Sequence, residues 1–230
     1  MKLLLIGHGR MGRLVETLAH DEGFDVVGSV ASGSASREWP AADVAIDFSV
    51  ADAVPATVAR LASRRTPIVI GTTGWQAHEA AVRAAAASAG LGVVAAPNFA
   101  IGVNVFLAMV AHMGTLMAAQ PSFGAWIHEM HHAAKKDAPS GTALAMEQRL
   151  RRQGYSAEVP IASTRAGAIP GTHVLGFDTA SETITLTNQA RDRAAFARGA
   201  LLAAHWVIGR TGWFTMSDVL NLSHGSANER

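Results

Sequence analysis

The sequence predicts a doubly wound parallel α/β sheet, joined to a smaller α+β domain with a mixed sheet. Three observations predict this fold. In the N-terminal part, short aliphatic runs alternate with alanine-rich helical patterns, which is typical of βαβ units around a parallel sheet. After Asn98 this alternation stops and a long apolar helix follows. From residue 157 onward, three strand-like runs succeed one another without helices, which indicates an antiparallel or mixed sheet.

Hydrophobic periodicity predicts the elements of the first domain. Runs of Leu, Ile and Val predict strands at 2–6, 25–30, 44–48, 67–70 and 92–95. Alanine-rich segments between them predict helices at 11–21, 51–63 and 76–88. Helices therefore separate most of the strands, as connections between parallel strands require.

The second domain is predicted from other elements. A helix is expected at 103–118, a strand at 125–130, and a helix from about 140 to 153 that Gly154 ends as a C-terminal cap. Further strands are expected at 157–163, 173–177 and 183–187, and a last helix at 193–208. We expect residues 1–103, completed by 193–222, to form the first domain and residues 104–192 the second. The polar tail 223–230 is expected to be disordered.

Composition and charge limit the function classes. The 230 residues include 19 basic and 18 acidic ones, so no strong field would recruit nucleic acid or an anionic membrane. Small molecules and other copies of the chain are the expected partners. The lack of cysteine excludes disulfides and thiolate metal sites. The start, MKLLLIGHG, is too short an apolar run for a signal peptide, which predicts a cytoplasmic protein. The apolar segment 99–119 is interrupted by Asn104, His112 and Gly114, which favours a buried helix over a membrane span.

A G-x-G-x-x-G motif follows the first predicted strand and opens the first helix. It comprises Gly7, His8, Gly9, Arg10, Met11 and Gly12. Glycines let the backbone turn tightly and approach a pyrophosphate, while the helix N-terminus presents free N–H groups to its charge. The motif therefore predicts a Rossmann-like dinucleotide-binding domain. A glycine-rich turn without a ligand would show the same pattern.

The segment after the second strand bears on the choice of cofactor. The acidic residue that would hold the ribose hydroxyls is missing there, because the chain reads VASGS from Val30. Without a carboxylate to repel it, a 2′-phosphate could be bound by Ser32, Ser34 and Arg37. We expect NADPH or NADH as the cofactor, with a mild preference for NADPH.

Two further loops lie at the carboxyl ends of predicted strands, where doubly wound sheets bind ligands. The first comprises Gly71, Thr72, Thr73 and Gly74, and the second Ala96, Pro97, Asn98 and Phe99. Their small and hydroxylated residues would let the chain run close to a nicotinamide ribose, and Asn98 could bond an amide. Each loop taken alone is equally compatible with an ordinary turn.

Residues 128–132 read HEMHH and match the H-E-x-x-H pattern of zinc proteases. That site needs both histidines on one helix, yet Pro139 would cut such a helix short, and Lys135 and Lys136 would oppose a cation. The third ligand would have to come from the scattered His173, Glu182 or His205. We therefore expect no metal.

The stretch EMHHAAKKDAPSGT suits an anionic substrate better. Lys135 offers a positive charge, and Ser140-Gly141-Thr142 opens a helix whose first N–H groups can hold a carboxylate. A histidine beside such a site, His131 or His132, could act as a general acid. We expect a loop that enters a helix. Ordinary helix capping and structural histidines would produce the same pattern.

The stretch 129–143 resembles the signature of the dihydrodipicolinate reductase family. The resemblance extends over most of the chain. Further matching segments are, in order, 9–12, 47–49, 71–74, 98–99, 102–104, 171–173, and Arg193 ahead of 196–200. Members of this family use NAD(P)H to reduce a dehydrated cyclic imine dicarboxylate to tetrahydrodipicolinate in lysine and diaminopimelate synthesis. The resemblance therefore implies an oxidoreductase with that activity.

The resemblance also implies roles for individual residues. His131 is expected to donate the proton, with Lys135 as its catalytic companion. The two substrate carboxylates are expected to be held by His132, Lys135, Ser140, Gly141, Thr142 and Arg193. A homotetramer joined through the sheet of the second domain is also implied. The chain departs from the family pattern in a nucleotide loop that is one residue shorter, in the absent acidic ribose ligand, and in Asn188, where a histidine is common.

Two other functions stay open from the sequence. A different NAD(P)-dependent dehydrogenase of amino or imino acids would keep residues 7–12 but has no need of the whole stretch 129–143. A non-catalytic nucleotide-binding sensor would also keep the first domain, yet it could lose His131 or Lys135, and both are present.

Overall fold

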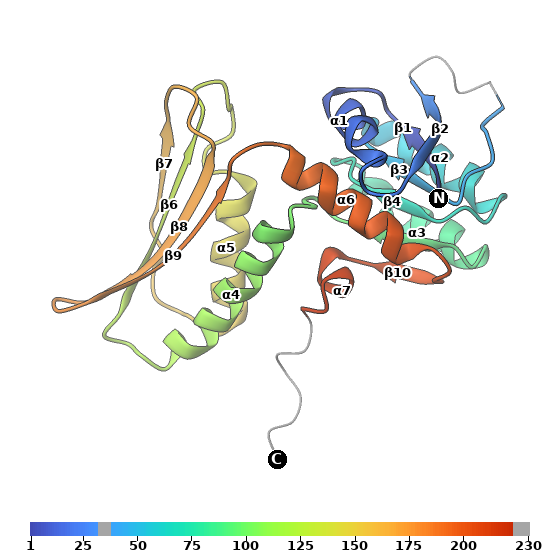
Figure 1. Cartoon of the computed structure of the whole chain (residues 1–230). Helices are drawn as coiled ribbons and strands as arrows, with labels where there is room; N and C mark the ends of the chain where they lie inside the picture. The colour runs from blue at the N-terminus through green and yellow to red at the C-terminus, as the bar shows by residue number, and fades with distance from the viewer. Residues whose placement is uncertain (32–37, 223–230) are drawn as a thin grey trace. The chain divides into compact units, whose positions relative to one another are not determined.

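The computed structural model describes residues 1–31 and 38–222. The predicted phosphate ligands Ser32, Ser34 and Arg37, and the tail 223–230, lie outside the described residues. The chain divides into two compact units (Figure 1). Of the described residues, Met1–Ile101 and 193–222 form one unit, and Gly102–Asp192 form the other.

The first unit is built on a six-stranded sheet in the order β10-β5-β4-β3-β1-β2. Its strands are β1 (Lys2–Ile6), β2 (Asp25–Val30), β3 (Val44–Asp47), β4 (Ile68–Ile70), β5 (Gly92–Ala95) and β10 (Gly212–Phe214). Neighbouring strands pair in parallel throughout. The strand order reverses at β1, which lies between β2 and β3. The predicted doubly wound parallel sheet is confirmed.

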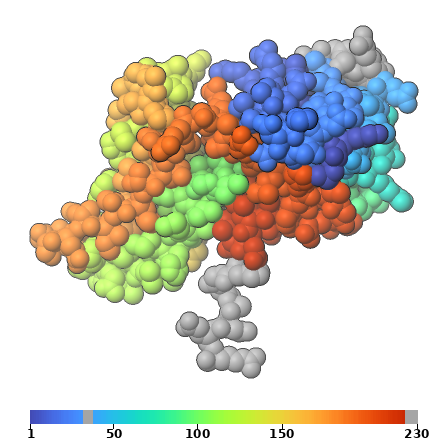
Figure 2. All heavy atoms as spheres, in the orientation of Figure 1, coloured from blue at the N-terminus to red at the C-terminus, as the bar shows by residue number. Residues whose placement is uncertain are grey.

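Helices cover both faces of this sheet. They are α1 (Arg10–Ala19), η1 (Ala51–Ala53) leading into α2 (Val54–Ala62), η2 (Gln76–His78) leading into α3 (Glu79–Ser88), α6 (Ala194–Val207) and α7 (Met216–Val219). Alternate residues of β1 face opposite sides: Leu3 and Leu5 pack with α1 and α6, whereas Leu4 packs with α2 and α3. In Figure 2, orange to red atoms of the C-terminal part of the chain, to which α6 belongs, lie next to blue atoms of the N-terminal segment. The helix α6 therefore completes the core of the N-terminal sheet.

The second unit is built on a four-stranded mixed sheet in the order β7-β6-β8-β9. Its strands are β6 (Gly124–His131), β7 (Ile161–Arg165), β8 (Gly171–Asp178) and β9 (Thr183–Ala190). β6 pairs in parallel with β7 and antiparallel with β8, and β8 pairs antiparallel with β9. The helices α4 (Ile101–Ala118) and α5 (Gly141–Arg152) lie along one face of the sheet (Figure 1). The predicted mixed sheet of the second domain is confirmed.

The apolar helix α4 is a core element of the second unit. Its 18 residues have a mean hydropathy of 1.7, so by length and composition alone it could cross a membrane, but 33% of it is buried inside the protein. Its close packing on α5 depends on Gly114, because a Cβ there would lie 3.2 Å from the Cα of Leu150. The prediction of a buried helix holds for one face only: Val110 is buried, whereas Met109 and Leu116 are exposed.

Candidate active site

The HEMHH sequence lies on a strand, which settles its geometry. The strand was expected to end at residue 130, but His131 is the last residue of β6. The loop that follows therefore starts at His132. Four residues of extended chain span about 13 Å, so His128 and His132 cannot chelate one metal as a helical pair would. His128 instead bonds the hydroxyl of Thr164 at 2.9 Å.

Glu129 occupies a position where β6 would ordinarily carry an apolar residue. Alternate residues of the strand are buried, and Ala125, Ile127 and Glu129 face the same side. Ile127 is 1% exposed and Glu129 is 0% exposed. The covered face of the sheet is thus apolar at one end and polar at the other. An acid at an inward position of an alternating strand was the sequence signal that could have singled out Glu129.

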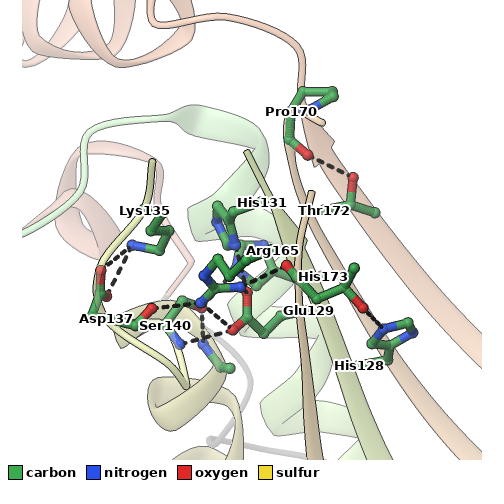
Figure 3. Close-up of polar contacts among 12 residues, drawn as sticks. His128, Glu129, His131, Lys135, Asp137, Ser140, Arg165, Pro170, Thr172 and His173 are labelled. Atoms are coloured by element: carbon green, nitrogen blue, oxygen red, sulfur yellow. Dashed lines mark hydrogen bonds and ion pairs between the residues drawn. The ribbon is translucent and has the colours of Figure 1, made fainter. Parts of the chain in front are cut away.

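The buried carboxylate of Glu129 collects hydrogen bonds from three elements (Figure 3). The guanidinium of Arg165 donates to both of its oxygens, at 2.6 and 2.9 Å. The backbone N–H of Ser140 donates to Oε1 at 3.2 Å, and Nδ1 of His131 lies 2.5 Å from Oε2. Burial opposes ionisation, but hydrogen bonds from Arg165, Ser163 and His131 outweigh it and lower the pKa of Glu129 to about 2. Neither Glu129 nor Arg165 has a role that the sequence predicts.

His131 is held between charged groups and a second histidine. Its side chain is 13% exposed, and its ring meets that of His173 edge to face, with centroids 5.1 Å apart. Burial lowers the pKa of His131; Glu129 opposes this effect, while Lys135 and Arg165 add to it. A bound dianion would favour the protonated ring, because it would offset the two cations.

His173 is the cross-strand partner of Glu129 in β8. It is 5% exposed, and its Nε2 lies 3.1 Å from the hydroxyl of Ser140. Burial, reinforced by His131, lowers the pKa of His173 to about 4. Its Nδ1 and the Oδ1 of its β9 partner Asn188 are buried without a hydrogen-bond partner in the described part of the chain. From the sequence, His173 was predicted only as a possible metal ligand and as part of a segment that matches the family.

The start of α5 has the features of an anion site. Ser140 is the N-cap, and its hydroxyl accepts the N–H of Ala143 at 3.3 Å. A Cβ on Gly141 would have no atom within 4 Å, so the space beside it is open. Backbone N–H groups in a first turn have no partner within the helix, and the helix dipole favours negative charge there.

Lys135 lies next to this helix start but is not free of partners. Its Nζ contacts both carboxylate oxygens of Asp137, at 2.7 and 2.9 Å. The Lys135 hydrogen bond lowers the pKa of Asp137, which therefore stays ionised. An ammonium group has three donors, so Lys135 can hold Asp137 and a ligand carboxylate together.

The second unit brings most of the predicted substrate residues together. His131, His132 and Lys135 follow one another at the end of β6, and Ser140, Gly141 and Thr142 open α5. His132 is half-buried, and its ring has no polar partner within the described ranges. Arg193 belongs to the first unit, where it is the N-cap residue of α6.

A metal does not fit the polar cluster. The ligand atoms of Glu129, His131 and His173 all lie within 4.8 Å of one another. However, both oxygens of Glu129 are engaged by Arg165, and Lys135 adds a second positive charge nearby. A cation would have to displace the guanidinium and tolerate the ammonium. The cluster suits an anion instead.

The glycine-rich loop in the first unit fits a pyrophosphate. Gly7 has a φ of +89°, and a Cβ there would lie 2.3 Å from the carbonyl oxygen of Phe48. Gly12 packs against Gly7, and Gly9 is the N-cap of α1 without a side-chain cap and with nothing within 4 Å of a Cβ. The N–H groups at the start of α1 therefore face open space. His8 is paired with Glu16 at 2.7 Å, Arg10 is exposed and Met11 is half-buried.

The other two predicted cofactor loops are partly structural. The hydroxyl of Thr72 donates to the buried carboxylate of Asp47 at 2.9 Å, so it points into the protein. Phe99 is 2% exposed and packs edge to face on Phe48. Asn98 accepts the N–H of Ala100 through Oδ1 at 2.9 Å, which fixes the turn. Exposed side chains in these loops are those of Thr73 and Pro97, and Gly71 is half-buried.

A pocket flanks β2 and the residues after the undescribed segment. Its lining includes Ser29, Val30, Glu38 and Trp39. Glu38 contributes a carboxylate near the end of β2, where the adenosine ribose of a dinucleotide is expected.

The pKa of His173 predicts how stability depends on pH. Because the pKa is about 4 in the folded chain and ordinarily 6.5, the unfolded chain binds more protons between these values. Stability should therefore fall as the pH drops from 6.5 to 4, by about 3 kcal/mol for this residue. Urea unfolding of the wild type and of His173→Gln across this range measures the effect. The exposed His112→Gln is the control, and an equal pH dependence in His173→Gln and the wild type would contradict the assignment.

Family models match most of the chain. The model described as "Dihydrodipicolinate reductase, N-terminus" matches residues 34–99, and "Dihydrodipicolinate reductase, C-terminus" matches residues 102–220. Among curated proteins, the 4-hydroxy-tetrahydrodipicolinate reductase of Acidiphilium cryptum is 39% identical over 93% of this chain and 94% of its own. That of Christiangramia forsetii is 32% identical over 96% of this chain and 98% of its own.

Solved structures show the same fold. A dipicolinate-bound dihydrodipicolinate reductase from Paenisporosarcina sp. TG-14 superposes with a TM-score of 0.77 at 23% identity, covering 94% of this chain and 97% of its own. A probable dehydrogenase from Thermotoga maritima reaches a TM-score of 0.58 at 9% identity, covering 96% and 93%. Because both family models and both curated relatives agree over nearly the whole length, the chain belongs to the dihydrodipicolinate reductase family.

Proposed function

We propose that the protein is a 4-hydroxy-tetrahydrodipicolinate reductase, which reduces the dehydrated cyclic imine dicarboxylate to tetrahydrodipicolinate in lysine and diaminopimelate biosynthesis. One observation carries the proposal. A partly exposed histidine, His131, ends a strand beside a lysine and an open helix start, within 12 residues of chain that match the family signature. This arrangement pairs a proton donor with a site for carboxylates.

The chain's own residues would bind and orient the substrate. The N–H groups of Gly141 and Thr142 and the ammonium of Lys135 would hold one carboxylate, since both supply positive charge at the start of α5. His132 and Arg193 are the further groups proposed to hold the carboxylates. Holding both ends fixes the ring relative to His131, which is a large part of what an enzyme supplies in such a reaction.

His131 would supply the proton. In its protonated form the ring can give up the Nε2 proton to the reduced substrate while Nδ1 stays directed at Glu129. When bound, the nicotinamide cofactor supplies the hydride. Lys135 would stabilise the negative charge of the substrate during this transfer.

The first unit supports the use of NAD(P)H. The proposed contacts are the loop Gly7, His8, Gly9, Arg10, Met11 and Gly12 for the pyrophosphate, Ser32 for the ribose, and Gly71, Thr72, Thr73, Pro97, Asn98 and Phe99 for the nicotinamide end. Because the Thr72 and Phe99 side chains point into the protein, these two residues would contribute through their backbone. The preference for NADPH is part of the proposal.

The proposal extends to domain roles and to assembly. Residues 1–103 with 193–222 would form the dinucleotide domain, and residues 104–192 the domain for substrate and oligomerisation. A cytoplasmic homotetramer that binds neither nucleic acid nor membranes is part of the proposal; the family resemblance supports the tetramer, and the balanced charge of the chain supports the absence of those partners.

A coupled assay tests the function. The product of dihydrodipicolinate synthase is supplied together with NADPH, and oxidation of NADPH is expected to depend on both the synthase and this protein. A folded protein that oxidises no NADPH above background would overturn the proposal. Nucleotide binding without turnover would then indicate the sensor, and turnover with other imino acids would indicate a different dehydrogenase.

Two substitutions test the catalytic roles. His131→Gln and Lys135→Ala should each lower kcat by roughly 10²-fold or more, because each removes a group that acts at the reacting atoms. The matched controls are His128→Gln, on the same strand, and Lys136→Ala, an exposed neighbour. Both controls should keep the wild-type rate. Wild-type rates in His131→Gln or Lys135→Ala would contradict the assigned role of that residue.

Steady-state kinetics with the two dinucleotides test the cofactor. NADPH should be preferred over NADH in kcat/KM by up to roughly tenfold, the worth of a charge-assisted hydrogen bond to the 2′-phosphate. Arg37→Ala should reduce the efficiency with NADPH and leave that with NADH unchanged. A strong preference for NADH in the wild type would refute the expected NADPH preference.

A further inference from the structure

Glu129 cannot serve the reaction by exchanging a proton. It is fully buried, and two hydrogen bonds from Arg165 keep its carboxylate ionised across the working range of pH. It therefore keeps a fixed negative charge behind His131. Its hydrogen bonds connect it both to His131, the proposed proton donor on β6, and to Ser140, the N-cap of α5.

This geometry selects one direction for the histidine ring. Nδ1 of His131 lies 2.5 Å from Glu129, so the Nδ1–H donates to the carboxylate and the ring presents Nε2 on its other side. On that side the chain has a glycine. A Cβ on Gly171 would lie 3.1 Å from Nε2, tighter than an ordinary contact. The absence of a side chain at Gly171 leaves Nε2 accessible.

The same carboxylate positions the anion site. Ser140 donates its backbone N–H to Glu129, and its hydroxyl meets both the N–H of Ala143 and Nε2 of His173. Arg165 in turn bonds the carbonyl oxygen of Asp137 at 2.5 Å. The loop between β6 and α5, which carries Lys135, is thereby attached to the sheet at both ends.

On the basis of the proposed function, we propose that Glu129, held by a bidentate ion pair with Arg165, is the positioning residue of the site. One buried carboxylate sets the direction of the His131 ring and the start of the helix that receives a substrate carboxylate. Arg165 acts through Glu129, to which both of its terminal nitrogens donate.

The proton balance follows from this arrangement. The His131 imidazolium carries protons on Nδ1 and Nε2, and it gives the Nε2 proton to the substrate. The neutral Nδ1–H form remains, with its hydrogen bond to Glu129 intact, and solvent restores the Nε2 proton. Without the carboxylate, the neutral ring could keep its proton on Nε2 instead. A comparable carboxylate–histidine pair loses up to about 10⁴-fold in kcat when its tautomer is wrong.

Four groups set the charge around His131. Glu129 lies on its own strand, Arg165 on β7, His173 on β8, and Lys135 in the loop before α5. Glu129 is the one acid among these four. Its neutralisation should weaken proton binding by His131, because the hydrogen bond and negative charge that favour the protonated ring are then lost while Lys135 and Arg165 still disfavour it.

The first experiment is a pH profile of Glu129→Gln. We expect kcat to fall by roughly 10²-fold or more and the alkaline limb of kcat/KM to move to lower pH. A merely structural loss would lower the rate and leave the limb where it is. Glu158→Gln, an exposed acid in the same unit, is the control and should change neither quantity. A limb at the wild-type pH in Glu129→Gln would overturn the proposal.

The second experiment measures the tautomer directly and needs no turnover. Nitrogen NMR of ¹⁵N-histidine-labelled protein should show neutral His131 as the Nδ1–H form in the wild type. The variant Glu129→Met with Arg165→Met removes both charges together, so no unpaired charge is left buried to unfold the chain. In this double variant, the Nδ1–H form should no longer be the main neutral tautomer of His131. An unchanged tautomer, or an Nε2–H form in the wild type, would refute the positioning role.

The two experiments separate this inference from the proposed function. If the coupled assay fails but the tautomer changes as expected, the reductase assignment is wrong and the positioning role stands. If the enzyme turns over but the tautomer and the pH limb do not respond to Glu129, the reductase assignment stands and the positioning role is wrong.

Discussion

The candidate site depends on one buried ion pair, between Glu129 and Arg165. Removing a carboxylate from water costs several kcal/mol, and this cost is offset only when its oxygens are well paired. Here the partners come from β6, β7 and the start of α5. The strand register and the helix position must therefore be correct together. The direction of His131 and the place of the loop carrying Lys135 follow from that single requirement.

The two units divide the requirements of a two-substrate reaction. The first presents a glycine loop and an uncapped helix start, where Gly7 and Gly12 pack closely, as the proposed approach of the backbone to a pyrophosphate would require. The second would present the proposed proton donor and a capped helix start beside Lys135. Both would use helix N-termini for negative charge, but the first would do so through backbone alone and the second would add Lys135.

Secondary structure was predictable in segments with a clear pattern of hydrophobic residues. β1, β2 and β5 have the predicted bounds, and the helices begin within a few residues of the expected positions. β10 and α7 were not predicted, because their short segments, GWF and MSDV, contain no run of aliphatic residues. β7 was placed too early, since it starts only after Pro160, whose nitrogen cannot donate to a ladder. The stretch expected as a loop begins inside β6, because the alternating burial continues to Glu129.

The sequence by itself determined the fold class, and it predicted the kinds of chemistry: a dinucleotide loop, a helix start for an anion, and a histidine and a lysine that precede this helix. These are local patterns, which a few consecutive residues specify. Only the tertiary structure decided that Glu129, Arg165 and His173 meet and that Thr72 turns inward to Asp47. Glu129 and Arg165 are 36 residues apart, and strand register alone brings them together. Register depends on how whole strands bury their faces, and no local period encodes it.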